Sequence, residues 1–202
     1  MKVLHVDASI LGESSVSRQL SAAVVQRLRQ AHPEATVTYY DLGAEPIGHP
    51  TGAHLAAAAG AAAGNPSLQQ DLARGQQALE DFLGADVVVV GAPMYNFSVS
   101  SQLKAWIDRL SVAGKTFRYS KEGPQGLAGG KKVIVASSRG GFYGTDRPTA
   151  FLDHQETYLR GIFGFFGITD ITFVRAEGLN VSADQRQASV AAATAEAARI
   201  AA

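Results

Sequence analysis

The sequence contains no cysteine, and this absence removes several kinds of chemistry at once. Disulfides, thiolate metal sites and cysteine nucleophiles all require that side chain. The five histidines show no spacing typical of metal ligands, and we expect His49 and His54 to be solvated or structural. We therefore predict neither a metal centre nor a catalytic thiol.

An excess of charge of either sign is also missing. Lysine and arginine together number 18, as do aspartate and glutamate, so the formal net charge is +0. Proteins that follow the phosphates of nucleic acid usually carry a basic surface, so we expect no nucleic-acid partner. No apolar run approaches the roughly 18 residues of a membrane-spanning helix, and the first residues lack the layout of a signal peptide. We expect a cytoplasmic protein without a membrane partner.

Three familiar catalytic patterns are absent as well. The chain has no Gly-x-x-x-x-Gly-Lys-[Ser/Thr] loop, so it is not a nucleoside triphosphatase of that type. It has no Gly-x-Ser-x-Gly elbow, which argues against a serine hydrolase. Asp7 follows an apolar run, but the acidic pair that accompanies a receiver-type phosphoacceptor is missing.

Five short segments rich in apolar and β-branched residues predict strands. One holds four consecutive valines, Val87 to Val90, the pattern of a central parallel strand buried on both faces, and we expect Gly91 and Pro93 to end it. Helical patterns separate the segments, so the βα order predicts a doubly wound α/β sheet with helices on both faces, in one domain over residues 1–202. The predicted strands span residues 3–7, 36–42, 87–90, 132–138 and 171–174.

Four segments depart from the plain βα alternation or mark its limits. Residues 43–66 are broken by prolines and rich in alanine, which predicts a long excursion with one short helix. The Thr-Phe-Arg-Tyr alternation at 116–119 predicts a surface flap. Residues 149–166 are predicted to be helical, and Ser182 is a plausible N-cap for the closing helix.

Three loops follow the carboxyl ends of predicted strands, at residues 9–17, 93–97 and 138–141. In a sheet of order 2-1-3-4-5 the preceding strands are neighbours at the point where open α/β sheets bind ligands. The first loop offers serine hydroxyls and the N–H groups of a helix N-terminus, which suit a phosphate held by neutral donors. The second offers flat side chains and Asn96, and the third offers glycine backbone that can approach a ring edge. Together they predict a planar heterocycle whose tail ends in one phosphate.

Several motifs recur in the order typical of one enzyme family. Residues 92–97 read Ala-Pro-Met-Tyr-Asn-Phe and residues 137–141 read Ser-Ser-Arg-Gly-Gly, with shorter matches at 117–119, 166–170 and 176–178. Over nearly the whole chain this pattern resembles the FMN-dependent NADH-azoreductases and the related NAD(P)H:quinone oxidoreductases. The resemblance implies a flavodoxin-like homodimer with one FMN per subunit. It also implies a ping-pong transfer of two electrons from NADH or NADPH to quinones and azo compounds.

The resemblance further implies roles for individual residues. The FMN phosphate would lie at the first loop, and the isoalloxazine ring would lie between the second and third loops. Tyr119 and Phe163 are candidates for substrate contacts, and residues 53–63 and 142–144 would border the substrate cavity. No protein acid or base is implied, because the cofactor carries the hydride. The implied cofactor contacts are Ser9, Ser15, Val16, Ser17, Pro93, Met94, Tyr95, Asn96, Phe97, Ser138, Arg139, Gly140 and Gly141.

Plainer interpretations exist for the same residues and for the whole chain. The serines of the first loop could be ordinary N-caps, and Tyr95 and Phe97 could be core aromatics. Gly140 and Gly141 alone could form a simple turn. A flavodoxin-type carrier of single electrons would share the fold and ligand, although such carriers are typically strongly acidic. A flavin-free regulatory module is the other alternative.

Overall fold

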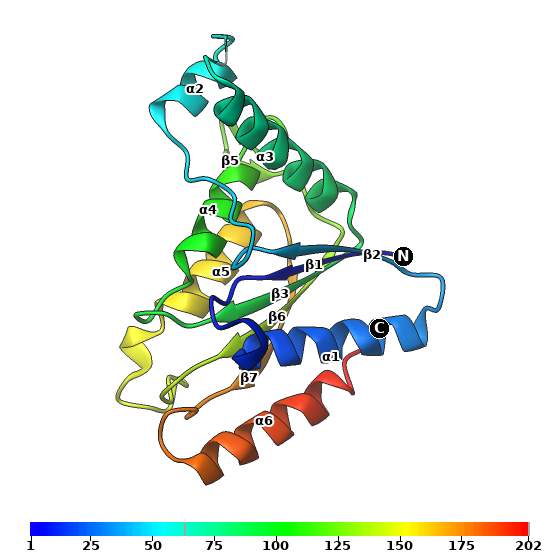
Figure 1. Ribbon diagram of the computed structural model, residues 1–202, viewed down its shortest axis with the longest axis vertical. Helices are drawn as coiled ribbons and strands as arrows, with labels where there is room; N and C mark the ends of the chain where they lie inside the picture. Colours follow the sequence, from blue (N-terminus) through cyan, green and yellow to red (C-terminus); the bar gives the residue numbers. More distant parts are fainter. Residues whose placement is uncertain (63, 202) are drawn as a thin grey trace.

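A computed structural model describes residues 1–62 and 64–201, with a five-stranded parallel sheet in the middle of the molecule (Figure 1). The strand order is β2-β1-β3-β6-β7, which is the predicted 2-1-3-4-5 once the separate hairpin β4-β5 is set aside. The predicted fold class is confirmed. Ala63, in the alanine-rich stretch, and Ala202 lie outside the described residues. The sheet strands are β1 (Lys2–Asp7), β2 (Thr36–Asp41), β3 (Val87–Pro93), β6 (Lys132–Ser138) and β7 (Asp170–Ala176).

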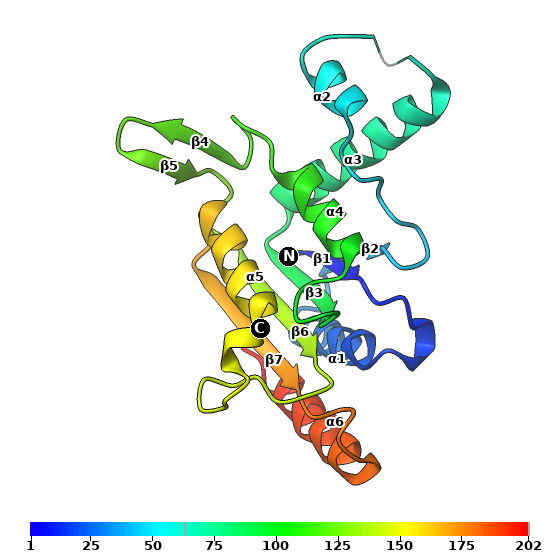
Figure 2. The ribbon, with the colours of Figure 1, turned by 90° about the vertical axis from the view of Figure 1, so that its left-hand side faces the viewer.

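Helices cover both faces of this sheet, as expected (Figures 1 and 2). Helices α1 and α6 lie on one face, and α3, α4 and α5 lie on the other. Within residues 1–62 and 64–201, no helix is both long and apolar enough to cross a bilayer. The helices are α1 (Val16–Ala31), α2 (Gly52–Ala58), α3 (Pro66–Gly84), α4 (Ser101–Leu110), α5 (His154–Phe165) and α6 (Ala183–Ala197).

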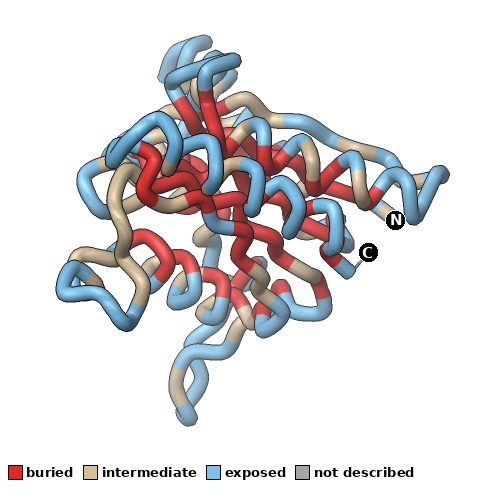
Figure 3. The backbone as a smooth tube through the Cα atoms, turned by 90° about the horizontal axis from the view of Figure 1, so that it is seen from below, coloured by how far each residue is buried: buried red, intermediate tan, exposed pale blue. Residues whose placement is uncertain are grey.

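Strand β3 is buried along its whole length, which confirms its predicted central place. Figure 3 shows that the buried segments of the chain gather in the middle of the molecule. Val88 and Val90 pack on the α3-α4-α5 side, while Val87 and Val89 pack on the α1-α6 side. Burial of each such side chain contributes roughly 1.5 to 3 kcal/mol. The double coverage explains why Val87 to Val90 are apolar at every position.

The expected end of this strand at Gly91 is wrong. Pairing continues through Pro93, which lies opposite Ser138 of β6. A Cβ added at Gly91 would lie only 2.1 Å from Oδ1 of the buried Asp7 carboxylate on β1. The glycine therefore makes room for a neighbouring side chain and does not interrupt the strand.

The predicted helix over 149–166 is divided into two parts. A short 3-10 turn, η2 (Ala150–Leu152), precedes α5, and Asp153 lies between them. The Asp153 carboxylate accepts the Glu156 N–H at 3.0 Å, so it begins a new helix in place of continuing the first. At the closing helix, the Ser182 side chain accepts the Gln185 N–H, which confirms the predicted N-cap.

The predicted flap is an antiparallel hairpin of β4 (Phe117–Ser120) and β5 (Gly123–Gly126), which projects from the body of the molecule (Figure 2). Its base is packed tightly against the end of α5. A Cβ added at Gly126 would lie 2.0 Å from the backbone nitrogen of Gly167. The close backbone approach anchors the hairpin while its tip stays exposed.

The excursion between β2 and α3 contains one short helix, as expected, and a cluster around Asp71 attaches it to the body. The Asp71 carboxylate contacts His54 Nε2 at 2.8 Å, Arg109 Nη1 at 2.7 Å and the Gly48 N–H at 3.0 Å. Burial alone would raise the pKa of Asp71, but the hydrogen bonds outweigh it and hold that pKa at about 2. His54 therefore has the structural role expected of it.

Candidate functional site

The three predicted loops meet at the carboxyl edge of the sheet and contact one another directly. Ser9 Oγ of the first loop lies 3.2 Å from the Tyr95 hydroxyl of the second. The Met94 N–H of the second loop donates to the Ser138 carbonyl of the third at 2.8 Å. The expectation that topology brings these loops together is confirmed.

The first loop ends as a capped helix N-terminus. Ser15 Oγ accepts the Arg18 N–H at 3.2 Å and lies 3.1 Å from Ser17 Oγ, and both serines are buried. The plain N-cap interpretation is therefore correct for Ser15. This role does not use all the donors at the helix start, because the N–H groups of Val16 and Ser17 have no acceptor among the described residues. These two amides are available to an anion.

The Arg18 guanidinium at this helix start is already engaged. Arg18 forms a bidentate pair with Asp41 at 2.7 and 2.9 Å and donates to the Tyr39 hydroxyl at 2.6 Å. Hydrogen bonding to Asp41 raises the pKa of Arg18, and the same bond lowers the pKa of Asp41. Burial raises the pKa of Tyr39 to about 12, so its hydroxyl stays protonated. A phosphate at the first loop would be held by neutral donors, as predicted.

The second loop is a tight two-residue turn in an unusual conformation. The Tyr95 and Ser98 backbones exchange hydrogen bonds of 2.9 and 3.0 Å across the turn. Asn96 and Phe97 between them have φ of 47° and 70°, as a type I′ turn requires. Asparagine tolerates this region, but phenylalanine rarely adopts it, and such a residue costs on the order of 1 to 3 kcal/mol.

The strained turn presents its side chains outward. Phe97 is 40% exposed and Asn96 is exposed, while Met94 and Tyr95 are half-buried. The alternative that Tyr95 and Phe97 are core aromatics is therefore wrong. The Phe97 ring lies 6.0 Å from the Tyr143 ring of the third loop, edge to face. A strained, outward-facing aromatic next to a glycine loop is typical of a ligand site.

The third loop offers donors toward the same edge. The Gly140 and Gly141 carbonyls accept the N–H groups of Asn180 and Gly178, each at 2.9 Å. The N–H groups of the two glycines have no acceptor among residues 1–62 and 64–201. The loop is thus more than a plain turn. Its carbonyls are held by Gly178 and Asn180, and its N–H groups remain available.

The resemblance placed Arg139 beside the cofactor, but the structure directs its side chain elsewhere. The guanidinium is buried and lies within 2.9 Å of Asp153, 2.6 Å of Glu156 and 3.3 Å of Glu177. Its backbone N–H donates to the Ala176 carbonyl. Three carboxylates of the protein bind the Arg139 guanidinium, so the implied contact of this side chain with the cofactor is wrong.

The two candidates for substrate contacts have opposite surroundings. Phe163 has no exposed area and packs against Phe82 and Phe166, so the proposed substrate contact there is wrong. Its position four residues after the buried Leu159 is the spacing of a core face. Tyr119, in the hairpin, is 76% exposed and remains a candidate.

The sequence-based prediction missed Gln155, which is completely buried beneath the second and third loops. Its amide hydrogen-bonds Ala92 and Ser137 at 2.9 and 3.0 Å, at the ends of β3 and β6. A polar residue four positions before Leu159, on the apolar face of α5, was the available signal.

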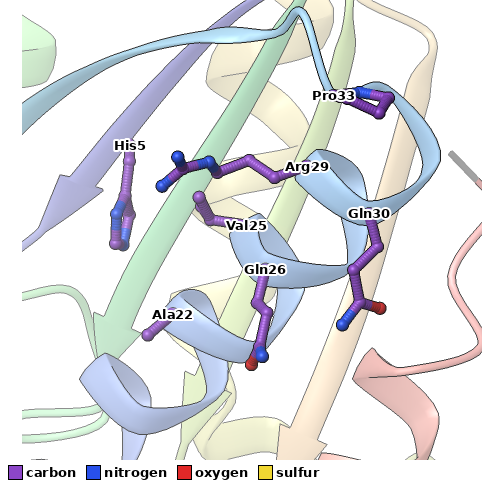
Figure 4. A pocket seen from close by; sticks show the side chains of 7 residues that line it. All are labelled: His5, Ala22, Val25, Gln26, Arg29, Gln30 and Pro33. Atoms are coloured by element: carbon purple, nitrogen blue, oxygen red, sulfur yellow. The ribbon is translucent and has the colours of Figure 1, made fainter.

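Two cavities of equal volume lie near α1 or the loops, and one of them borders the second loop. A cavity of about 510 Å³ opens beside the second loop. Another of about 510 Å³ lies along the second half of α1 (Figure 4), at the opposite end of that helix from the three loops. The first is lined by Tyr95, Asn96, Ser98, Val99, Ser101, Lys104 and Tyr158, and the second by His5, Ala22, Val25, Gln26, Arg29, Gln30 and Pro33.

The chemistry available at the loops is binding and orientation. No cluster of three or more histidine or carboxylate side chains in the described residues could hold a metal ion. Amide donors at one end and aromatic and glycine surfaces at the other fit an elongated ligand with a phosphate and a flat ring.

Comparison with known proteins agrees with this geometry. The family described as a flavodoxin-like fold matches residues 1–200. An FMN-dependent NADH:quinone oxidoreductase from Sinorhizobium medicae is 61% identical over 193 residues, covering 96% of this chain and 93% of the relative. The crystal structure of an azoreductase from Bacillus anthracis str. Sterne is 34% identical, with a TM-score of 0.87 and coverage of 98% and 97% of the two chains.

A second solved structure bears on the ligand. The FMN-dependent NADH-azoreductase from Bacillus anthracis str. Ames Ancestor, in complex with FMN, has a TM-score of 0.86 at 26% identity, over 100% of this chain and 99% of the other. The family match spans nearly the whole chain, and the sequence identity to a curated relative is high. The chain therefore belongs to the flavodoxin-like fold family that includes the FMN-dependent NADH:quinone oxidoreductases.

Proposed function

We propose that this protein is an FMN-dependent NADH:quinone oxidoreductase that also reduces aromatic azo compounds. One observation carries the proposal: three loops from β1, β3 and β6 converge at one sheet edge, with free amides at one end and a strained aromatic turn at the other. This edge is where open α/β folds bind nucleotides.

The phosphate end would use the first loop. The N–H groups of Val16 and Ser17 lie at the helix start, where the hydroxyls of Ser15 and Ser17 are 3.1 Å apart. Ser9 Oγ, at the beginning of the same loop, accepts the Leu11 N–H and lies 3.2 Å from the Tyr95 hydroxyl. The positive end of the α1 dipole adds to their attraction for a dianion. The paired Arg18 contributes no free charge, so hydrogen-bond geometry selects the ligand here.

The ring end would use the second and third loops. Pro93 to Phe97 would form one wall and edge of the ring site, and the amides of Gly140 and Gly141 would donate to the carbonyl edge of the ring. Ser138 fixes the spacing, because its carbonyl accepts the Met94 N–H. Fixed backbone dipoles of this kind orient a cofactor and adjust its electronic properties.

The reaction needs little from protein side chains. Bound FMN would supply the hydride chemistry between NADH and the quinone or azo acceptor, in two half-reactions, while the three loops would hold and orient it. NADH and the acceptor would bind in turn at the same place, which is the ping-pong order. Tyr95, Phe97 and Tyr143 provide apolar surface where flat substrates can stack.

We also propose that the protein works as a homodimer. The hairpin projects from the body, and Tyr119 near its tip is 76% exposed. Exposed aromatic side chains on a projecting element are typical of interfaces. In a dimer this residue would reach the substrate side of the partner's site.

The test is to purify the protein, record a flavin spectrum and measure NADH and NADPH oxidation with a quinone and with an azo dye. We expect bound FMN and turnover of both acceptors. Bound FMN without NADH oxidation would favour the single-electron carrier. A colourless protein that does not bind added FMN would overturn the proposal and favour the regulatory module.

A further inference from the structure

We infer that Gln155 is a positioning residue that sets the spacing of the two loops proposed to hold the flavin ring. The inference rests on the proposed function. Gln155 lies in the first turn of α5 and is completely buried, so it is held beneath the loops and away from their open edge. Its Nε2 donates to the Ala92 carbonyl at 2.9 Å, and its Oε1 accepts the Ser137 hydroxyl at 3.0 Å.

These two contacts lie at the points where the loops leave the sheet. Ala92 directly precedes Pro93, and Ser137 directly precedes Ser138. Apart from the sheet pairing, the Met94 N–H to Ser138 carbonyl bond connects the same two segments above. A ligand site of this kind must hold its contacts to within about 0.5 Å. Gln155 supplies the second connection, from below.

The carboxamide suits both contacts because it carries a donor and an acceptor. The Ala92 carbonyl needs a donor, and the Ser137 hydroxyl hydrogen needs an acceptor. Arg139 Nε donates to Gln155 Oε1 at 3.2 Å and to Ser137 Oγ at 3.0 Å. Because a guanidinium can only donate, it requires the amide oxygen on its own side. The amide nitrogen is therefore directed toward Ala92.

Carboxylates hold Arg139 in place, and Arg139 in turn fixes the orientation of the Gln155 amide. The guanidinium lies 2.9 Å from Asp153 and 2.6 Å from Glu156 at the start of α5, the helix that carries Gln155. The Glu177 carboxylate accepts hydrogen bonds from Arg139 Nη1 and from the Tyr143 N–H, just after the third loop. Gln155, Arg139 and Glu156 are buried, and Asp153 and Glu177 are partly exposed. Every member of the network is hydrogen-bonded or ion-paired, which favours one geometry over alternatives.

The test compares Gln155→Leu with Gln155→Glu in the full-length chain, first without FMN. Gln155→Leu removes both contacts, whereas Gln155→Glu keeps the volume and the acceptor but removes the donor to Ala92. We expect faster amide hydrogen exchange at residues 92–98 and 138–144 in the leucine variant. In the glutamate variant we expect it only at residues 92–98, because the contact to Ser137 is retained.

The second measurement is FMN binding. We expect the dissociation constant to rise about tenfold in Gln155→Leu and about threefold in Gln155→Glu, since each lost hydrogen bond weakens the loop geometry. The affinities for oxidised and reduced FMN should change unequally. A tenfold difference between them shifts the two-electron potential by about 30 mV.

The matched control is Leu159→Ala, a core truncation one turn further along the same helix. We expect it to lower the melting temperature without a local change in exchange at the loops or in the potential.

Equal exchange and equal potential in the Gln155 variants and the wild type would overturn the inference. Loop effects in Leu159→Ala as large as those in Gln155→Glu would do the same. If Gln155→Leu does not fold, Gln155→Glu decides. Absence of FMN binding in the wild type would instead reject the proposed function, and the exchange data would still stand.

Discussion

The first loop and the turn at residues 95–98 lie at the two ends of the proposed FMN site, yet they are built by opposite means. The first loop uses ordinary geometry: Ser15 caps α1, and the donors come from a regular helix start. The turn uses strain, with Asn96 and Phe97 both at positive φ. A phosphate can be bound by any well-formed helix N-terminus, whereas a flat ring needs a surface that regular structure does not provide.

The largest effect is expected from removing the serines of the first loop. Ser15→Ala/Ser17→Ala removes the two hydroxyls proposed to contact the phosphate. Hydrogen bonds to charged groups contribute about 1.5 to 3 kcal/mol each, so the FMN dissociation constant should rise roughly 100-fold. Equilibrium dialysis or fluorescence titration measures it. Ser14→Ala, at an exposed neighbouring position, is the control and should leave FMN retention unchanged. Unchanged retention in the double variant would show that the phosphate lies elsewhere.

At the turn, Asn96→Leu tests whether the conformation or the amide matters. A leucine at φ 47° costs on the order of 1 to 2 kcal/mol, so unfolding should occur at lower denaturant concentration. The flavin affinity or potential should also change. Asn96→Gly provides the comparison, because glycine adopts this φ freely and removes only the side chain. A leucine variant as stable as the wild type would contradict the strained turn.

A smaller and opposite effect is expected from Phe97→Gly. The sequence Asn-Gly is preferred in a type I′ turn, so this change should raise the free energy of unfolding by about 1 kcal/mol. FMN binding should weaken, because the exposed ring and the fixed turn contribute to the site. Chemical denaturation and FMN titration on the same preparation measure both. If stability and FMN affinity rise together, the strain has no function.

The smallest effect is expected far from both loops, at Asp71. Its pKa of about 2 lies below the ordinary 3.8, so ionised Asp71 stabilises the fold above pH 4 and that contribution is lost as the pH falls toward 2. Asp71→Asn should lower the free energy of unfolding at pH 7 by about 1 kcal/mol, allowing for partial solvent screening. The difference from the wild type should shrink at pH 3, and FMN affinity should not change. A difference independent of pH would contradict the ionised cluster.

Local patterns were most informative where one physical requirement dominates. The valines of β3 predict a strand buried on both faces because no other environment suits four of them in sequence. Gly91 shows the limit of the same reasoning, since its purpose is set by Asp7 on another strand. Asp153 likewise divides a helix because its side chain accepts the Glu156 N–H, which the apolar periodicity does not reveal.

The sequence alone was enough for the five strands and for the three loops that follow them, because hydrophobic period and turn residues act over short distances. Tertiary structure alone decided which side chains those loops present. It buried Phe163, engaged Arg139 with three carboxylates and placed Gln155 between two strand ends. The contacts of Arg139 with these carboxylates and of Gln155 with the two strand ends join residues 14 to 63 positions apart, so they depend on packing and not on any local pattern.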